Sequence, residues 1–268
     1  MVSVSHIVVL IVVFLVSAGI LLLLLWPRAR SGVRLLRNWG VAEPTSEQGR
    51  VARHYLLNRR LLYAVFIVLA GPVGALTTLA VGRSYFPYVG WFLAALLLAE
   101  LIAMLRPVRG QVRVATLERR SIRDVLPRWM IAVHLVTVAA AVAGVVALDV
   151  DRENQPGTAP VWVQVLVVIA SAVAVYAVAW FAVARPAVGD PQVDRALRLR
   201  SARVMIGLGT MFAATLLAGM LSLITAWPGT AGTVALVVQA FGLVMWGVMA
   251  SAFAFWSGFR GKVPARNG

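Results

Sequence analysis

Two ionisable residues lie inside long apolar runs, where they could do chemistry. Glu100 precedes Arg106 by six residues, and His134 follows Arg128 by six residues. At a rise of about 1.5 Å per residue, each lies about 9 Å inside its run. A carboxylate and an imidazole at the same depth could meet between neighbouring helices and relay a proton or bind a cation. A cytoplasmic arginine is the second expected partner of Glu100.

A structural role is the alternative for both residues. In that case Glu100 extends toward an arginine outside the apolar layer, and His134 bonds a backbone carbonyl. An isolated buried charge is costly, so either role requires a partner for Glu100.

A helix break is the next candidate, because Pro72 lies between Gly71 and Gly74 in the middle of another apolar run. Proline removes one helix hydrogen bond and clashes with the preceding turn, which predicts a kink or a break. Broken helices line the substrate sites of several transporters. The alternative is a kink that only shapes packing. Gln239, a polar residue of the last apolar run, is expected to form a hydrogen bond between helices.

The runs that position these residues predict an all-α integral membrane protein, with residues 1–268 as one polytopic membrane domain. Hydrophobic residues make up 61% of the 268 and charged residues 13%, and the mean hydropathy is +0.87. A soluble domain has about a quarter of its residues charged. A membrane span needs about 20 mostly apolar residues. The sequence predicts seven such transmembrane helices, at residues 6–26, 61–81, 86–105, 128–149, 161–184, 204–226 and 231–257.

Basic residues predict the orientation. Of the 25 lysines and arginines, only Arg83 and Arg152 lie in short loops away from four basic segments. Positive residues flanking spans are retained in the cytoplasm, which predicts an outer N-terminus and an inner C-terminus in the plasma membrane. The first span is then an anchor, and the other six form three helical hairpins. The cytoplasmic segments are residues 27–60, 106–127, 185–203 and 258–268.

Arginines of these segments are candidates for binding anionic lipid or a cytoplasmic protein, because basic clusters beside a membrane attract both. The alternative is a solvated basic surface that only fixes topology. In the first segment, Thr45 and Gln48 have the spacing of a capping box, so a basic helix is expected from about Ser46 into the second span. The candidate arginines are Arg50, Arg53, Arg59, Arg60, Arg119, Arg120, Arg123, Arg198, Arg200 and Arg203.

Several classes of site are excluded. The chain has no cysteine, which removes disulfides, thiolate metal sites and cysteine nucleophiles. It has no P-loop and no H-E-x-x-H motif. Its one lysine, Lys262, lies beyond the last span, so no span offers a lysine to retinal. We expect no metal and no cofactor. The basic segments lack interleaved aromatic residues, and nucleic acid is not an expected partner.

Three classes of function remain. The first, which we favour, is a non-enzymatic membrane subunit or scaffold of a transport system, whose basic face docks anionic lipid and a partner such as a transport ATPase. The second is an autonomous transporter of ions or small molecules that uses the Gly71–Gly74 break and Glu100. The third is an intramembrane enzyme acting on lipid-linked substrates, for which only Glu100 and His134 offer acid–base groups.

The topology can be tested with a reporter enzyme that is active only in the cytoplasm. We expect activity when the reporter is fused after Gly268 or within residues 40–50, because these positions adjoin basic segments. We expect no activity from a fusion at residues 152–158. Activity at the last position would overturn the predicted topology.

Overall fold

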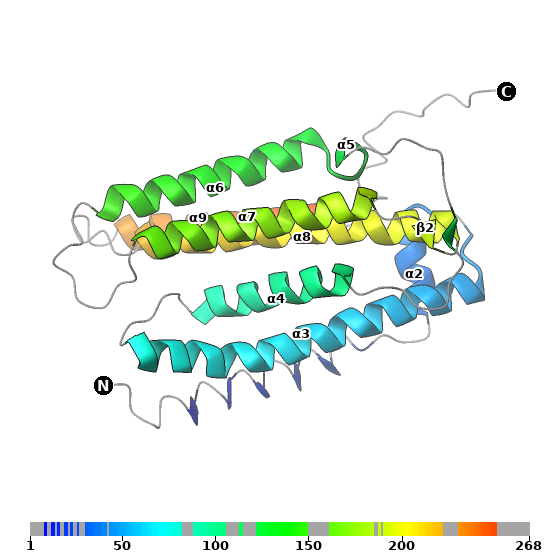
Figure 1. The fold of residues 1–268 in the computed structure, drawn as a ribbon, viewed down its shortest axis with the longest axis horizontal. Coiled ribbons are helices and arrows are strands. Elements are labelled where there is room, and N and C mark those ends of the chain that lie inside the picture. Colours follow the sequence, from blue (N-terminus) through cyan, green and yellow to red (C-terminus); the bar gives the residue numbers. More distant parts are fainter. Residues whose placement is uncertain are drawn as a thin grey trace.

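The computed structural model contains a bundle of long helices that run side by side (Figure 1). The helices are α2 (Ser31–Asn38), α3 (Ser46–Val81), α4 (Tyr88–Leu105), α5 (Ile122–Val125), α6 (Arg128–Asp149), α7 (Val161–Ala184), α8 (Pro191–Leu221) and α9 (Thr230–Ala250). Two short strands, β1 (Arg113–Val114) and β2 (Ala187–Val188), pair antiparallel. The described residues are 30–41, 43–81, 88–105, 113–114, 122–149, 161–184, 187–188, 190–221 and 230–250, with short stretches between residues 8 and 26.

Among the described residues, five helices are long and apolar enough to cross a membrane. They lie within α3, α6, α7, α8 and α9, and α4 adds a shorter apolar stretch, Gly90–Met104. The described residues of the first predicted span are helical, and its Leu22 packs against a cluster of α3 and α4 that includes Ile67. A helical fold with five helices able to span a membrane is therefore confirmed. The number of passes and the orientation stay predictions.

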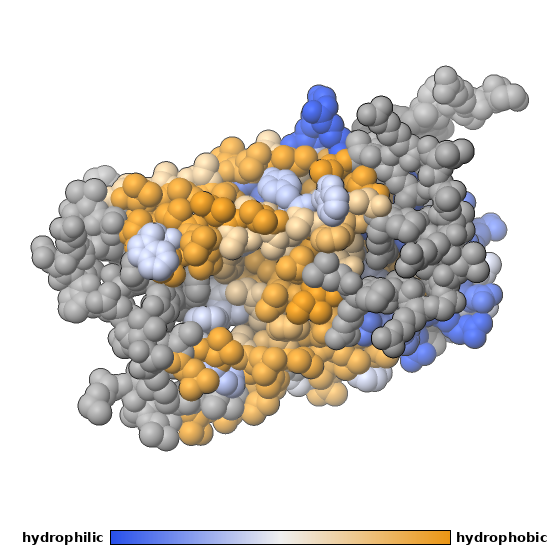
Figure 2. Space-filling model, in the orientation of Figure 1, coloured by the Kyte–Doolittle hydropathy of each residue, from blue (hydrophilic) through white to orange (hydrophobic). Residues whose placement is uncertain are grey.

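The arginine-bearing elements gather at one end of the bundle. There, α2, α5 and β2 lie beside the starts of α3, α6 and α8 (Figure 1). Hydrophobic residues cover the surface along the helices, and the hydrophilic residues lie mainly toward this end (Figure 2). This arrangement is the one expected if the basic segments share one side of a membrane. We call it the basic end.

Helix α3 begins with the predicted capping box and then runs unbroken for 36 residues. The Thr45 N–H donates to Gln48 Oε1 at 2.8 Å, and the Gln48 N–H donates to Thr45 Oγ1 at 3.3 Å. Pro72 lies inside the helix, so the break expected at Gly71–Gly74 is absent. Gly74 has a packing role instead, since a Cβ there would lie 3.2 Å from Nε1 of Trp91 on α4.

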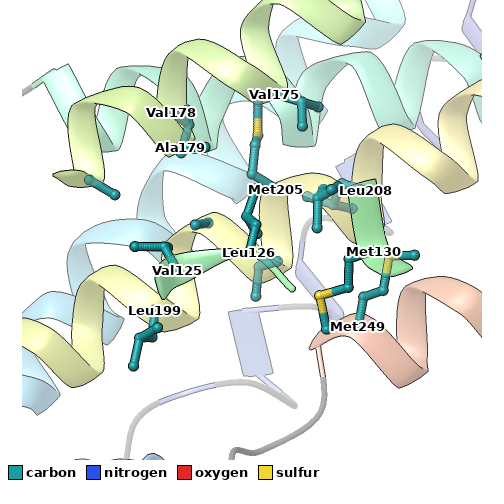
Figure 3. Close-up of a cluster of buried hydrophobic side chains, with 14 of the residues drawn as sticks. Val125, Leu126, Met130, Val175, Val178, Ala179, Leu199, Met205, Leu208 and Met249 are labelled. Carbon is teal, nitrogen blue, oxygen red and sulfur yellow. The ribbon is translucent and has the colours of Figure 1, made fainter. Parts of the chain in front are cut away.

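Helix α8 forms the centre of the bundle. In its spanning stretch 78% of the residues are buried, against 28% in α6 and α7 and 17% in α9. Its apolar side chains meet those of α5, α6, α7 and α9 in one cluster, part of which is drawn in Figure 3. Met205 and Leu208 of α8, Met130 of α6 and Met249 of α9 belong to this cluster. Unbranched methionine fills irregular gaps between crossing helices well.

Small residues let the helices approach α8 closely. A Cβ on Gly209 would lie 2.5 Å from Cγ2 of Val175 on α7 and 2.9 Å from Cε1 of His134 on α6. A Cβ on Gly247 of α9 would meet nothing within 4 Å. Gly209 is therefore required by packing within the chain, whereas Gly247 is not.

These two glycines form a matched pair for a stability test. We expect Gly209→Ala to lower the free energy of unfolding by about 1–3 kcal/mol, because Val175 and His134 must move. Gly247→Ala should be neutral or slightly stabilising, since alanine is the better helix former. Thermal unfolding in detergent measures both changes. Equal stability of the two variants would contradict the packing at α8.

Candidate functional site

One face of α3 presents Tyr55, Arg59 and Tyr63 at four-residue spacing, so the three side chains lie above one another on the helix. The face points toward α4 and α8 at the level where α3 enters its apolar half. Glu100 of α4 and Ser201 of α8 meet it there. The five residues form the site described next, which we call the clamp.

Glu100 is completely buried and is held by two residues of α3. Its Oε2 forms an ion pair with Nη1 of Arg59, whose side chain is only 3% exposed. Its Oε1 accepts a hydrogen bond from the Tyr63 hydroxyl. The carboxylate therefore has both a counter-charge and a hydrogen-bond donor, which a charge out of contact with water requires.

The other side of Arg59 connects the clamp to α8. Its Nη2 donates to Ser201 Oγ at 2.8 Å, and Ser201 Oγ lies 2.8 Å from the Leu197 carbonyl oxygen. Tyr55 Oη lies 2.7 Å from Ser201 Oγ. The Tyr55 ring also receives the Arg59 guanidinium at 4.4 Å from its centroid. One guanidinium thus ties α3 to both α4 and α8.

His134 is fully buried in a separate cluster and is not the partner of Glu100. Its Nδ1 lies 3.3 Å from Thr210 Oγ1 on α8. Its ring packs edge-on against Tyr176 of α7, with ring centroids 5.6 Å apart. Of the two partners expected for Glu100, an arginine of a predicted cytoplasmic segment is the one found, and it is Arg59. The structure does not bring the two acid–base candidates together.

The candidate arginines fall into three groups. Arg50, Arg53 and Arg123 are exposed, and Arg60 and Arg200 are half-buried. Arg59, Arg198 and Arg203 are buried, so these three do not face lipid or a partner as expected from the sequence. Arg119 and Arg120 lie outside the described residues.

Two of the buried arginines are held inside the bundle because α8 is surrounded by other helices. Arg198 lies 2.5 Å from Asp194 Oδ2 and donates to the Ala182 carbonyl oxygen at 3.0 Å. The guanidinium of Arg203 lies 5.6 Å from the centroid of the Trp39 ring. The sequence indicated that both lie beside a span, but not that α8 is central.

The starts of α3 and α8 are joined by one amide. Gln48 Nε2 donates to Asp190 Oδ2 at 2.6 Å, while Asp190 Oδ1 accepts the Gln192 N–H at 2.8 Å and so caps α8. The hydrogen bond from Gln48, aided by the backbone N–H groups of Gln192 and Val193, holds the pKa of Asp190 below its usual value. A lowered carboxyl pKa means that the cap is fully formed at neutral pH and is lost only as the pH falls through that pKa.

The remaining candidates offer little chemistry. Gln239 lies half-buried on α9. In the part of the chain that is described, no group of three His, Asp or Glu side chains could hold a metal ion. An open groove of about 430 Å³ runs along α6 and α7, and its lining is apolar apart from Tyr176 and Trp180.

Comparison with known proteins identifies no relative. No protein-family model, no curated protein and no solved structure matches the chain. Function must therefore be inferred from the clamp and from the distribution of charge around it.

The clamp predicts strong coupling between Arg59 and Glu100. Arg59→Gln and Glu100→Gln should each lower the free energy of unfolding by about 3–5 kcal/mol, because each leaves an uncompensated buried charge. The double variant should lose much less than the sum of the two. Denaturant titration in detergent measures this cycle. Arg50→Gln, on the exposed part of the same helix, serves as a control and should change stability by less than about 0.5 kcal/mol.

Additive losses in the double variant would contradict an ion pair. Glu100→Gln also separates a structural role from a functional one. A structural role lowers stability and activity together, whereas a functional role abolishes activity at unchanged stability.

Proposed function

We propose that this protein is a non-enzymatic, multi-pass subunit of the cytoplasmic membrane, whose basic end faces the cytoplasm and docks a partner protein and anionic lipid. The observation that carries the proposal is the contrast between two sets of charges. The intramembrane carboxylate Glu100 is neutralised by Arg59. Arginines at the basic end, including Arg34, Arg37 and Arg50, are exposed.

The state of Glu100 weighs against the transporter alternative. A cation or proton carried by this carboxylate would have to displace Arg59, and a buried arginine left behind would be as costly as a buried carboxylate. The continuous helix through Pro72 removes the other feature that this alternative used. Glu100 therefore serves to hold α3, α4 and α8 together.

The enzyme alternative loses support for a related reason. General acid–base chemistry requires groups within hydrogen-bond reach of a common substrate. Glu100 contacts Arg59 and Tyr63, whereas His134 contacts Thr210 and Tyr176. Glu100 therefore contacts α3, whereas His134 contacts α7 and α8, and the two side chains do not pair.

The partner proposed for the basic end is a cytoplasmic protein with an acidic surface, such as the ATPase of a transport complex. Exposed arginines attract such a surface at long range and fix its orientation on contact. Helix α2 adds to this surface, because Arg34 and Arg37 are exposed while Leu36 faces inward and is fully buried.

Affinity purification of the full chain from its native membrane tests this function. We expect a cytoplasmic protein to co-purify in a fixed ratio, and we expect it to be lost from Arg34→Gln/Arg37→Gln. The control is Arg83→Gln/Arg152→Gln, which removes the same charge from the predicted outer loops and should retain the partner. A protein that purifies alone and moves a solute when reconstituted would contradict the proposal.

A further inference from the structure

Two arginines beside the clamp, Arg60 and Arg200, are not neutralised by a carboxylate of the described residues. Among the described residues, the two buried carboxylates at this end are already paired, Glu100 with Arg59 and Asp194 with Arg198. Arg60 of α3 and Arg200 of α8 are half-buried next to them. Within the described part of the chain, neither of these two forms an ion pair with a carboxylate.

Arg60 and Arg200 directly adjoin, along the chain, the two clamp residues Arg59 and Ser201, which are hydrogen-bonded to each other. Arg200 Nη1 donates to Tyr55 Oη at 3.3 Å, and its guanidinium lies 5.6 Å from the centroid of the Tyr55 ring. Arg60 follows Arg59 directly, and its charge interacts unfavourably with that of Arg200. Arg59 is neutralised by Glu100, whereas the charges of Arg60 and Arg200 are not paired with a carboxylate among the described residues and are partly withdrawn from water.

The span limits predicted from the sequence place this pair at the depth of lipid phosphates. Arg60 immediately precedes the apolar run at 61–81, and Arg200 lies four residues before the run that starts at 204. Long basic side chains at such positions extend to the head-group layer. A half-buried, repelling pair at this level is stabilised by an anion that lies between the two groups.

We propose that Arg60 and Arg200 bind the phosphate of one anionic phospholipid at the seam between α3 and α8. A planar guanidinium offers paired N–H donors that match two phosphate oxygens. The phosphate would join α3 to the central helix α8 on the outer side of the clamp, and the acyl chains would lie against the apolar surface below it. This site deepens the proposed function, because it rests on a basic end that faces the head groups.

The test uses the purified full chain in an uncharged detergent. Phosphatidylglycerol, phosphatidylcholine and inorganic phosphate are titrated separately, and the thermal unfolding temperature is followed. We expect phosphatidylglycerol alone to raise the Tm. In Arg60→Gln the midpoint of this titration should move to about tenfold higher lipid, because one of two guanidinium groups is lost. In the control Arg128→Gln, a change of equal charge at the exposed start of α6, the midpoint should not move.

Folding of the variant is checked without lipid. Because Arg60→Gln removes a repulsion, its Tm in lipid-free detergent should equal or exceed that of the wild type. A large fall in that Tm would overturn the proposed repulsion. A titration unaffected by Arg60→Gln, or equally affected by Arg128→Gln, would overturn the site. Stabilisation by inorganic phosphate at the same concentrations would overturn the assignment to a lipid.

Failure of this site and failure of the proposed function are distinguishable. Co-purification of the partner depends on Arg34 and Arg37, which lie on α2 and are exposed, and not on Arg60. If the lipid titration fails while the partner still co-purifies, only the lipid site at Arg60 and Arg200 is contradicted. If the partner does not co-purify while the lipid titration succeeds, only the docking of a partner protein is contradicted.

Discussion

Burial of Glu100 is the constraint on which the arrangement of helices depends. A carboxylate inside the apolar layer must be compensated, and Arg59 is the residue that α3 can bring to it. Because Arg59 also bonds Ser201, the same guanidinium fixes the position of α3 relative to α8. Helix α8 is buried on most of its surface, mainly by α9, α6, α7 and α4, and the bond from Arg59 to Ser201 connects α3 to it.

The charges of the basic end then divide into two kinds. Arg59 and Arg198 are used inside the bundle, where each compensates a carboxylate. Arg34, Arg37 and Arg50 are exposed and give the surface its net positive charge. Internal pairing makes the fold specific, while the exposed arginines are available to anionic partners. A high arginine content therefore does not translate directly into a large binding surface.

Local features of the sequence were sufficient to predict the start of α3 and the need of Glu100 for a partner. The capping box at Thr45 and Gln48 depends on neighbouring residues only, and it is confirmed. The need of Glu100 for a partner follows from the cost of a buried charge. The identity of that partner depends on which helix faces sit opposite each other, and this is a property of tertiary packing. The four-residue spacing of Tyr55, Arg59 and Tyr63 is visible in the sequence and places the three side chains on one face of α3.

Pro72 shows where a local rule is not sufficient. The sequence predicted a kink or a break, and α3 continues through Pro72 without a break, with Gly74 packed against Trp91 of α4; a kink stays a prediction. The central claim is that Glu100 is an ionised, structural carboxylate. Infrared difference spectra between the wild type and Glu100→Gln at neutral pH test it most directly. We expect the variant to lose carboxylate bands only, and loss of a protonated carboxylic acid band would contradict the ion pair with Arg59.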